Sequence, residues 1–72
     1  MMVQDVVYIP NRGLMVLVDD VAVTAQVGGC LTQGGRMWRI LGIEHGRRNA
    51  VFVAANGLKP IPGMIYTSAL DT

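Results

Sequence analysis

Short runs of apolar residues alternate along this chain with residues that favour turns. Glycine, proline and asparagine interrupt the chain so often that few intervals could hold a helix. The interruptions are Pro10 to Gly13, Gly28-Gly29, Gly34-Gly35, His45-Gly46, Asn56-Gly57 and Pro60 to Gly63. This pattern predicts short β-strands joined by tight turns, and Asn56-Gly57 is typical of a two-residue hairpin turn.

The runs between these turns are rich in β-branched and aromatic residues, which favour strands. They cover residues 3–9, 14–18, 21–26, 36–43, 50–55 and 64–67. Alternation is clearest in the third run, where Val21 and Val23 share one face. We expect an all-β fold, a small closed or partly open β-barrel of about six short strands, because curling the sheet protects edges that would otherwise aggregate.

One predicted strand carries apolar side chains on both of its faces. In the run that starts at Arg36, Trp38 and Ile40 lie on one side, whereas Met37 and Leu41 lie on the other. Successive side chains of a strand point to opposite faces of the sheet, so one of these pairs must face away from the core. We expect a partner to cover the outer pair.

The amino-acid composition also favours an apolar surface that a partner covers. The chain has 72 residues, which we read as one domain covering residues 1–72, and 51% of them are hydrophobic whereas 15% are charged. Average globular chains are roughly 45–50% apolar and about 25% charged. A barrel of this size cannot enclose all these apolar side chains, and exposed clusters of them mark interfaces. We therefore expect a non-enzymatic, homo-oligomeric module without a cofactor, which binds another protein or a small ligand between subunits.

The net charge bears on the class of binding partner, and the cysteine content bears on the cellular compartment. The net charge of +1 is too small to drive binding to DNA or RNA through neutralisation of phosphates. A single cysteine, Cys30, cannot form an intrachain disulfide, which favours a reducing compartment. The first residues do not resemble a signal peptide, and Asp19 and Asp20 interrupt the most apolar segment, so membrane insertion is not expected. A soluble, cytoplasmic protein is the expectation.

Residues 3–16 read V-Q-D-V-V-Y-I-P-N-R-G-L-M-V. This run resembles the opening of the second, β-barrel domain of elongation factor Tu and related translational GTPases, which reads V-E-D-V-F-x-I-x-x-R-G-x-V-V. Gly42-Ile43-Glu44 resembles the family's G-I-E, and the segments Gly57 to Lys59 and Pro62 to Ile65 resemble its closing G-L-x and R-G-M-V. The order and approximate spacing agree over nearly the whole chain. The resemblance implies a Greek-key-like barrel.

The same resemblance implies only part of a tRNA-binding site. In elongation factor Tu an acidic pair of the opening motif helps to hold the terminal adenosine of aminoacyl-tRNA; here Gln4 replaces its first member and Asp5 matches the second. Arg12 and Gly13 match the turn of that motif. The family's A-G-D-N-V-G segment has no counterpart around residues 49–55. An RNA- or ribosome-contacting module is therefore the second functional interpretation.

GTP hydrolysis is excluded for this chain. A P-loop ends in Gly-Lys followed by Ser or Thr, because its backbone amides and lysine hold the phosphates. Here Lys59 is the only lysine, and it lies between Leu58 and Pro60.

The most polar loop supplies candidate binding residues, namely Glu44, His45, Arg47 and Arg48. Two adjacent arginines could bind a phosphate or a carboxylate through bidentate hydrogen bonds. Phosphate sites usually recruit more basic residues than this, and most such pairs are simply solvated. The loop is thus a candidate for anion or RNA binding, with solvated surface as the alternative.

A second candidate is the aromatic residue flanked by arginines in one strand. Arg36 and Arg39 lie on either side of Trp38, and an indole beside guanidinium groups can stack on the bases of single-stranded RNA. The alternative, a core or interface tryptophan, is the commoner role in a small domain. The methionines, especially Met37 and Met64, indicate packing or interface surface rather than ligands.

Catalytic and metal chemistry find little support. His45 is the only histidine and Ser68 the only serine, and the spacing identifies no carboxylate to orient a nucleophilic pair. One histidine and one cysteine cannot complete a tetrahedral zinc site within a chain. An enzyme whose site forms between subunits from Glu44, His45 and Arg47 is the third and least favoured interpretation.

Overall fold

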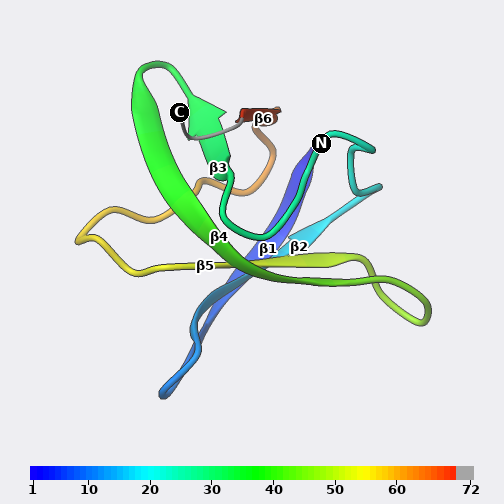
Figure 1. Ribbon diagram of the computed structural model, residues 1–72, viewed down its shortest axis with the longest axis horizontal. Coiled ribbons are helices and arrows are strands. Elements are labelled where there is room, and N and C mark those ends of the chain that lie inside the picture. The colour runs from blue at the N-terminus through cyan, green and yellow to red at the C-terminus, as the bar shows by residue number, and fades with distance from the viewer. Residues whose placement is uncertain (70–72) are drawn as a thin grey trace.

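The structure, a computed structural model, describes residues 1–69, which form a single six-stranded antiparallel sheet (Figure 1). The strands are β1 (Val3–Ile9), β2 (Gly13–Val18), β3 (Cys30–Gln33), β4 (Arg36–Glu44), β5 (Ala50–Val53) and β6 (Thr67–Ala69). Their order across the sheet is β1-β2-β5-β4-β3-β6. Short turns join β3, β4 and β5, and β6 returns by a long connection to lie beside β3, which is the arrangement of a Greek key.

Strand β4 curls the sheet around the core. Its first part pairs with β3 and its second part with β5, and the register shifts between Ile40 and Gly42. A bulge of this kind bends a strand and increases its twist. Figure 1 shows β4 as the long curved ribbon that runs between the two parts of the sheet. The sheet therefore curls around the main core instead of lying flat, and a second small cluster of Met15, Ala50 and Phe52 packs on the other face of β2 and β5.

The core contains the inward-facing side chains of the strands. Trp38 and Tyr66 are its largest members, with ring centroids 5.8 Å apart and planes tilted by 59°. Alternation along β4 places Trp38 and Ile40 inside and leaves Met37 and Leu41 exposed, which shows which of the two predicted faces points outward. The buried cluster consists of Val3, Leu14, Val16, Val18, Val21, Leu31, Trp38, Ile40, Val51, Val53 and Tyr66.

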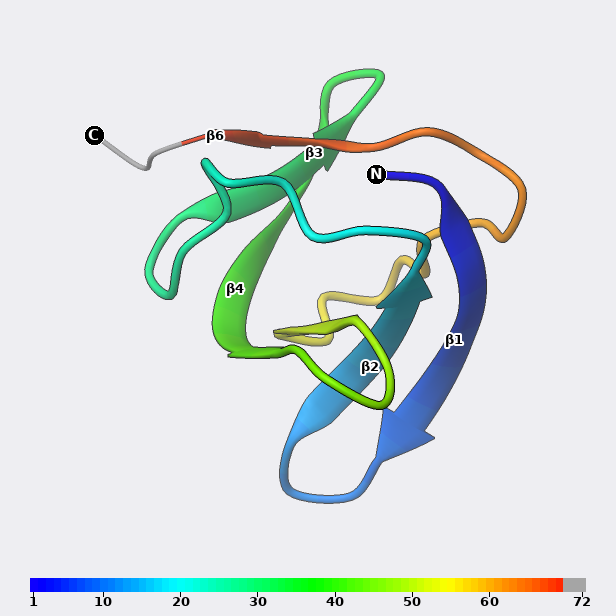
Figure 2. The same cartoon turned by 90° about the vertical axis from the view of Figure 1, so that its right-hand side faces the viewer.

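The two edge strands, β1 and β6, approach each other at a seam without forming a continuous ladder. The N–H of Val3 donates to the carbonyl of Met64 over 3.0 Å, and the N–H of Gly63 donates to the carbonyl of Val3 over 2.7 Å. Met2 and Ile65 form an isolated antiparallel bridge. Figure 2 shows the segment before β6, in orange, beside the start of β1. The fold is a partly open barrel, which confirms the predicted class.

The turn between β1 and β2 follows from its sequence. Proline at the second turn position and a positive φ at the third define a type II turn. Pro10 and Asn11, with a φ of 67°, occupy these positions, and the N–H of Arg12 donates to the carbonyl of Ile9 over 3.0 Å. Asparagine tolerates the left-handed conformation better than most residues.

The predicted strand at residues 21–26 is wrong. This stretch forms a turn in which the N–H of Ala25 donates to the carbonyl of Ala22 over 2.9 Å. Val21 is buried, whereas Val23 is fully exposed despite lying on the same predicted face. Strand β2 already pairs with β1 on one edge and β5 on the other, so the chain that follows it cannot pair with β2.

The sequence pattern did not predict β3. It also did not predict that Gly34-Gly35 forms a hairpin turn. The four residues of β3 lie between two glycine pairs, and Gly34 and Gly35 have φ angles of 57° and 80°. Positive φ at both central residues is what a tight hairpin turn requires. This pair therefore joins β3 to β4.

The prediction of a hairpin turn at Asn56-Gly57 is wrong. The Asn56 Oδ1 atom accepts from the N–H of Leu58 over 3.0 Å, and its Nδ2 donates to the carbonyl of Met37 over 2.8 Å. Asn56 thus holds the β5–β6 connection against β4.

The bounds of two predicted strands also differ from the structure. The strand predicted at residues 64–67 begins only at Thr67, and the strand predicted to end at residue 55 ends at Val53.

Candidate functional site

The seam carries four of the exposed large apolar side chains. Met2, Ile61, Met64 and Ile65 are 43%, 46%, 36% and 66% exposed, and we call them the seam patch. Met2 and Ile65 are direct partners across the isolated bridge, and such partners lie within reach of each other on one face of a sheet. Val3 and Tyr66, the next residues along each segment, are buried. Met2 and Ile65 therefore lie on the outer face of the barrel closure, and Ile61 and Met64 flank them along the chain.

No charged side chain lies in either segment of the seam. Residues 60–69 and residues 1–3 contain no Asp, Glu, Lys or Arg. Depletion of charged residues is a compositional mark of interface cores. Sequence analysis noted Met64 but missed Met2, Ile61 and Ile65; the charge-free stretch from residue 60 was the available signal.

On the side of β6 and β3 the surface next to the seam patch carries no charged side chain, whereas at the start of β1 the N-terminal ammonium of Met1 and the carboxylate of Asp19 both bond to the seam. Thr67 follows Ile65 on the same face and pairs with Thr32 of β3, which in turn pairs with Met37 of β4. The two threonine hydroxyls lie 2.9 Å apart and hydrogen bond to each other. Met37 is about half exposed. An uncharged outer surface thus runs from the seam across β6 and β3 to Met37.

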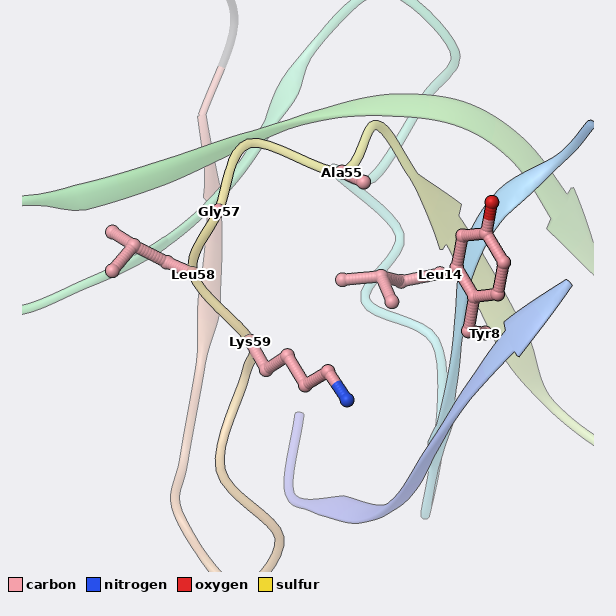
Figure 3. A pocket seen from close by; sticks show the side chains of 6 residues that line it. All are labelled: Tyr8, Leu14, Ala55, Gly57, Leu58 and Lys59. Carbon is pink, nitrogen blue, oxygen red and sulfur yellow. The ribbon is translucent and has the colours of Figure 1, made fainter. Parts of the chain in front are cut away.

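An open pocket of about 350 Å³ lies between the β1–β2 hairpin and the β5–β6 connection. We call it the hairpin pocket; Tyr8, Leu14, Ala55, Gly57, Leu58 and Lys59 line it. Tyr8 and Leu14 are partners across the hairpin. In Figure 3 the side chains of Leu14 and Lys59 extend into the space between the two segments, while that of Leu58 points away from Leu14. Sequence analysis did not single out this pocket, because its walls come from segments far apart in the chain.

In the polar loop between β4 and β5, one of the two arginines predicted to bind an anion is paired with a glutamate of the same chain. The Nε of Arg48 donates to Oε1 of Glu44 over 2.8 Å, and both side chains are partly exposed. Arg48 is therefore held by a neighbour instead of standing free beside Arg47. His45 and Arg47 are exposed. Exposed ion pairs of this type contribute little to stability.

Trp38 is 1% exposed, and its Nε1–H donates to the carbonyl of Leu58 over 3.1 Å. Neither face of its ring is accessible, so the prediction of base stacking on Trp38 is wrong. The alternative interpretation, a core tryptophan, is confirmed.

The arginine candidates lie in two separate places. Arg36 begins β4, whereas the loop with Arg47 and Arg48 follows its end, so the two groups lie at opposite ends of this nine-residue strand. Arg39 donates through Nη1 to the carbonyl of Gly28 over 3.1 Å. The structure thus does not bring the predicted cationic residues together into one basic surface.

The residues that match the elongation factor motif have structural roles here. The guanidinium carbon of Arg12 lies 4.1 Å from the centroid of the Phe52 ring, a distance at which the cation attracts the ring face. Gly13 has a φ of 93°, and a Cβ atom there would overlap the carbonyl oxygen of Val53. Asp5, on the exposed edge strand, accepts from the N–H of Val6 over 2.8 Å.

Asp19 joins three segments beside the seam. Its Oδ1 accepts from the N–H of Met2 over 2.8 Å and from the N–H of Asp20 over 2.7 Å. These bonds hold the pKa of the Asp19 carboxyl below its usual value because they favour the ionised form. The bond from the N–H of Met2 has the largest effect, followed by the bond from Asp20. The side chain of Asn49 donates to the carbonyl of Asp19 over 3.2 Å.

The residues considered for chemistry do not assemble into a site. Ser68 hydrogen bonds with Thr24, with hydroxyl oxygens 2.6 Å apart, Cys30 is buried in β3, and His45 lies exposed in the β4–β5 loop. Within residues 1–69, no three His, Cys, Asp or Glu side chains are grouped so that they could hold a metal ion. None of the described residues belongs to a helix that could traverse a bilayer.

Comparison of the chain with models of known protein families, with curated proteins and with solved structures found no match. The likeness to the second domain of elongation factor Tu stays a prediction. The interpretation of the site therefore depends on its geometry.

Proposed function

We propose that this chain is a non-catalytic interaction module that associates with copies of itself through the seam patch. The observation that carries the proposal is the gathering of four exposed apolar side chains on two segments without charged side chains. Water must be ordered around this surface in the free chain, and a partner that covers it gains the free energy of apolar burial.

A second copy suits this surface for electrostatic reasons. The net charge of +1 gives copies of the chain little mutual repulsion. A twofold interface places the same patch on both subunits, so an uncharged apolar strip is complementary to itself. Methionine side chains adapt their shape to irregular contacts, which suits Met2 and Met64 to this role.

A self-association interface has to cover more of the chain than the seam patch. A standard interface buries about 800 Å² on each partner, roughly a fifth of the 4383 Å² that the described residues expose. The seam patch alone is smaller than this. The continuation through Thr67 and Thr32 to Met37 supplies additional uncharged area.

Sedimentation velocity tests the proposal. At tens of micromolar, an order of magnitude at which weak interfaces form, the wild-type chain should sediment as a dimer or larger assembly. Ile65→Asp places a charge in the seam patch and should shift the chain to monomer. Val27→Asp is the matched control, since Val27 is 63% exposed against 66% for Ile65 but lies in the loop before β3. A monomeric wild type, or equal dissociation by both variants, would contradict the proposal.

A titration with single-stranded RNA and with tRNA at low ionic strength separates this function from RNA contact, because the electrostatic attraction is then strongest. The proposal expects no binding. Salt-dependent binding that Arg36→Gln or Arg47→Gln removes would favour an RNA-contacting module instead.

A further inference from the structure

The size and lining of the hairpin pocket fit a small ligand. Its volume of about 350 Å³ is at the lower end of the range for small-molecule sites, about 300–1,000 Å³. The buried side chain of Leu14 forms its floor, and Tyr8 and Ala55 contribute walls. A ligand of one or two fused rings matches this volume.

The charge of the pocket selects an anion. Lys59 extends its ammonium group into the pocket (Figure 3), and no hydrogen bond or ion pair joins it to another residue of the described range 1–69. None of the lining residues is acidic. An ammonium group beside an apolar wall binds a carboxylate more strongly than one in open water, because the surrounding dielectric constant is lower.

Tyr8 adds a preference for an aromatic body. The side chain is 60% exposed, and its hydroxyl makes no hydrogen bond within the described part of the chain. An exposed phenol ring offers a flat surface on which another ring can stack. The ring, the apolar floor and the single cation together fit a flat apolar body that bears one negative group.

We propose that the hairpin pocket binds a small aromatic carboxylate, with its ring against Tyr8 and Leu14 and its carboxylate on Lys59. This site is separate from the proposed self-association. Tyr8 lies near the hairpin end of β1, whereas the seam begins at the opposite end, at Val3. Either proposal can fail while the other stands.

Trp38 provides a built-in reporter for the pocket. It is the only tryptophan of the chain, and its indole N–H is bonded to the carbonyl of Leu58, which belongs to the pocket. A ¹H–¹⁵N NMR titration with naphthalene-2-carboxylate should shift the indole signal and the amides of residues 55–59. For a ligand of this size we expect a Kd on the order of 1 mM.

The neutral analogue naphthalene-2-carboxamide isolates the contribution of the charge. It should bind about tenfold more weakly than the acid, the effect of losing one charge-assisted hydrogen bond to Lys59. Lys59→Gln should remove this preference and leave the affinity for the amide unchanged. Lys59→Arg should retain the preference, and Tyr8→Ala should weaken both ligands roughly fivefold.

Both variant positions are exposed, so the folded spectrum should persist in each variant and every outcome is informative. Equal binding of the acid and the amide to the wild type would overturn the proposal. So would shifts that map to the seam patch while residues 55–59 stay unchanged. Sedimentation of the same samples shows separately whether the chain self-associates.

Discussion

The buried hydroxyl of Tyr66 accepts a hydrogen bond from the backbone N–H of Ile61 over 2.8 Å. This bond fixes the turn that presents the Ile61 and Met64 side chains at the surface. The same tyrosine packs its ring against Trp38 in the core. The seam patch is thus positioned by a buried aromatic pair, even though the seam itself is not a continuous β-ladder.

Replacing Tyr66 by phenylalanine removes the acceptor and leaves the Ile61 N–H without a partner. The free energy of unfolding should fall by about 1–3 kcal/mol, the cost of an unsatisfied buried donor. Urea unfolding followed by Trp38 fluorescence measures it. Tyr8→Phe is the control, because its exposed hydroxyl has no partner in residues 1–69; its effect should stay within about 0.5 kcal/mol. Equal losses in the two variants would show that the Tyr66 hydroxyl does not hold the turn.

Replacing Arg12 by glutamine removes the cation that lies over Phe52. Unfolding free energy should fall by about 0.5–1 kcal/mol, the usual contribution of such a pair at an exposed site. A double-mutant cycle with Phe52→Leu isolates the interaction from other effects of each substitution. Strictly additive losses in that cycle would mean that Arg12 and Phe52 do not interact.

The β1–β2 hairpin should tolerate no side chain at Gly13. Gly13→Ala combines a positive φ with overlap between the new Cβ and the carbonyl oxygen of Val53, and should cost more than about 3 kcal/mol. Gly57→Ala meets a similar φ, 87°, but open space, and should cost only about 1 kcal/mol. Urea denaturation gives both values, and circular dichroism reports the fold if Gly13→Ala is too unstable to titrate. Similar costs at the two positions would argue against the close approach of Gly13 to β5.

The stability of the fold should depend on pH through Asp19. Its folded pKa lies below the ordinary value of 3.8, so the unfolded chain takes up a proton more readily than the folded one. The carboxylate therefore stabilises the fold above about pH 4, and this contribution is lost as the pH falls through the folded pKa. Asp19→Asn keeps an acceptor oxygen but removes the titration.

Thermal unfolding at several pH values checks this dependence. Between about pH 5 and about pH 2 the melting temperature of Asp19→Asn should fall less steeply than that of the wild type. Asp20→Asn, at the neighbouring exposed position, should follow the wild type. Parallel curves for wild type and Asp19→Asn would contradict the assigned role.

The strands that could be predicted were those with a complete local signal. Residues 3–9 combine β-branched residues with a following Pro-Asn turn, and β1 has these bounds. Residues 21–26 show equally good alternation but form no strand. Strand formation requires a free edge, and the topology leaves none beside β2. Whether a segment pairs depends on the topology of the whole sheet, and the local sequence pattern carries no information about that topology.

The candidate site was less accessible to sequence reasoning than the fold. The two-faced pattern of β4 correctly put Trp38 and Met37 on opposite faces, because alternation depends only on strand geometry, but which face is buried came from the structure. The seam patch and the hairpin pocket, in contrast, combine residues that are distant in sequence: Met2 pairs with Ile65, and Tyr8 and Lys59 line the same pocket. Their proximity depends on the return of β6 past β1, which no local motif specifies.

Contact between seam patches of two copies is the central claim, and isotope-filtered NMR tests it directly. A mixture of ¹³C-methyl-labelled and unlabelled chains reports only those proton contacts that cross between copies. We predict intermolecular contacts from the methyl groups of Met2, Met64 and Ile65 at a few hundred micromolar, an order of magnitude that also populates weak dimers. The absence of such contacts, or contacts confined to Val23 and Val27, would contradict the claim.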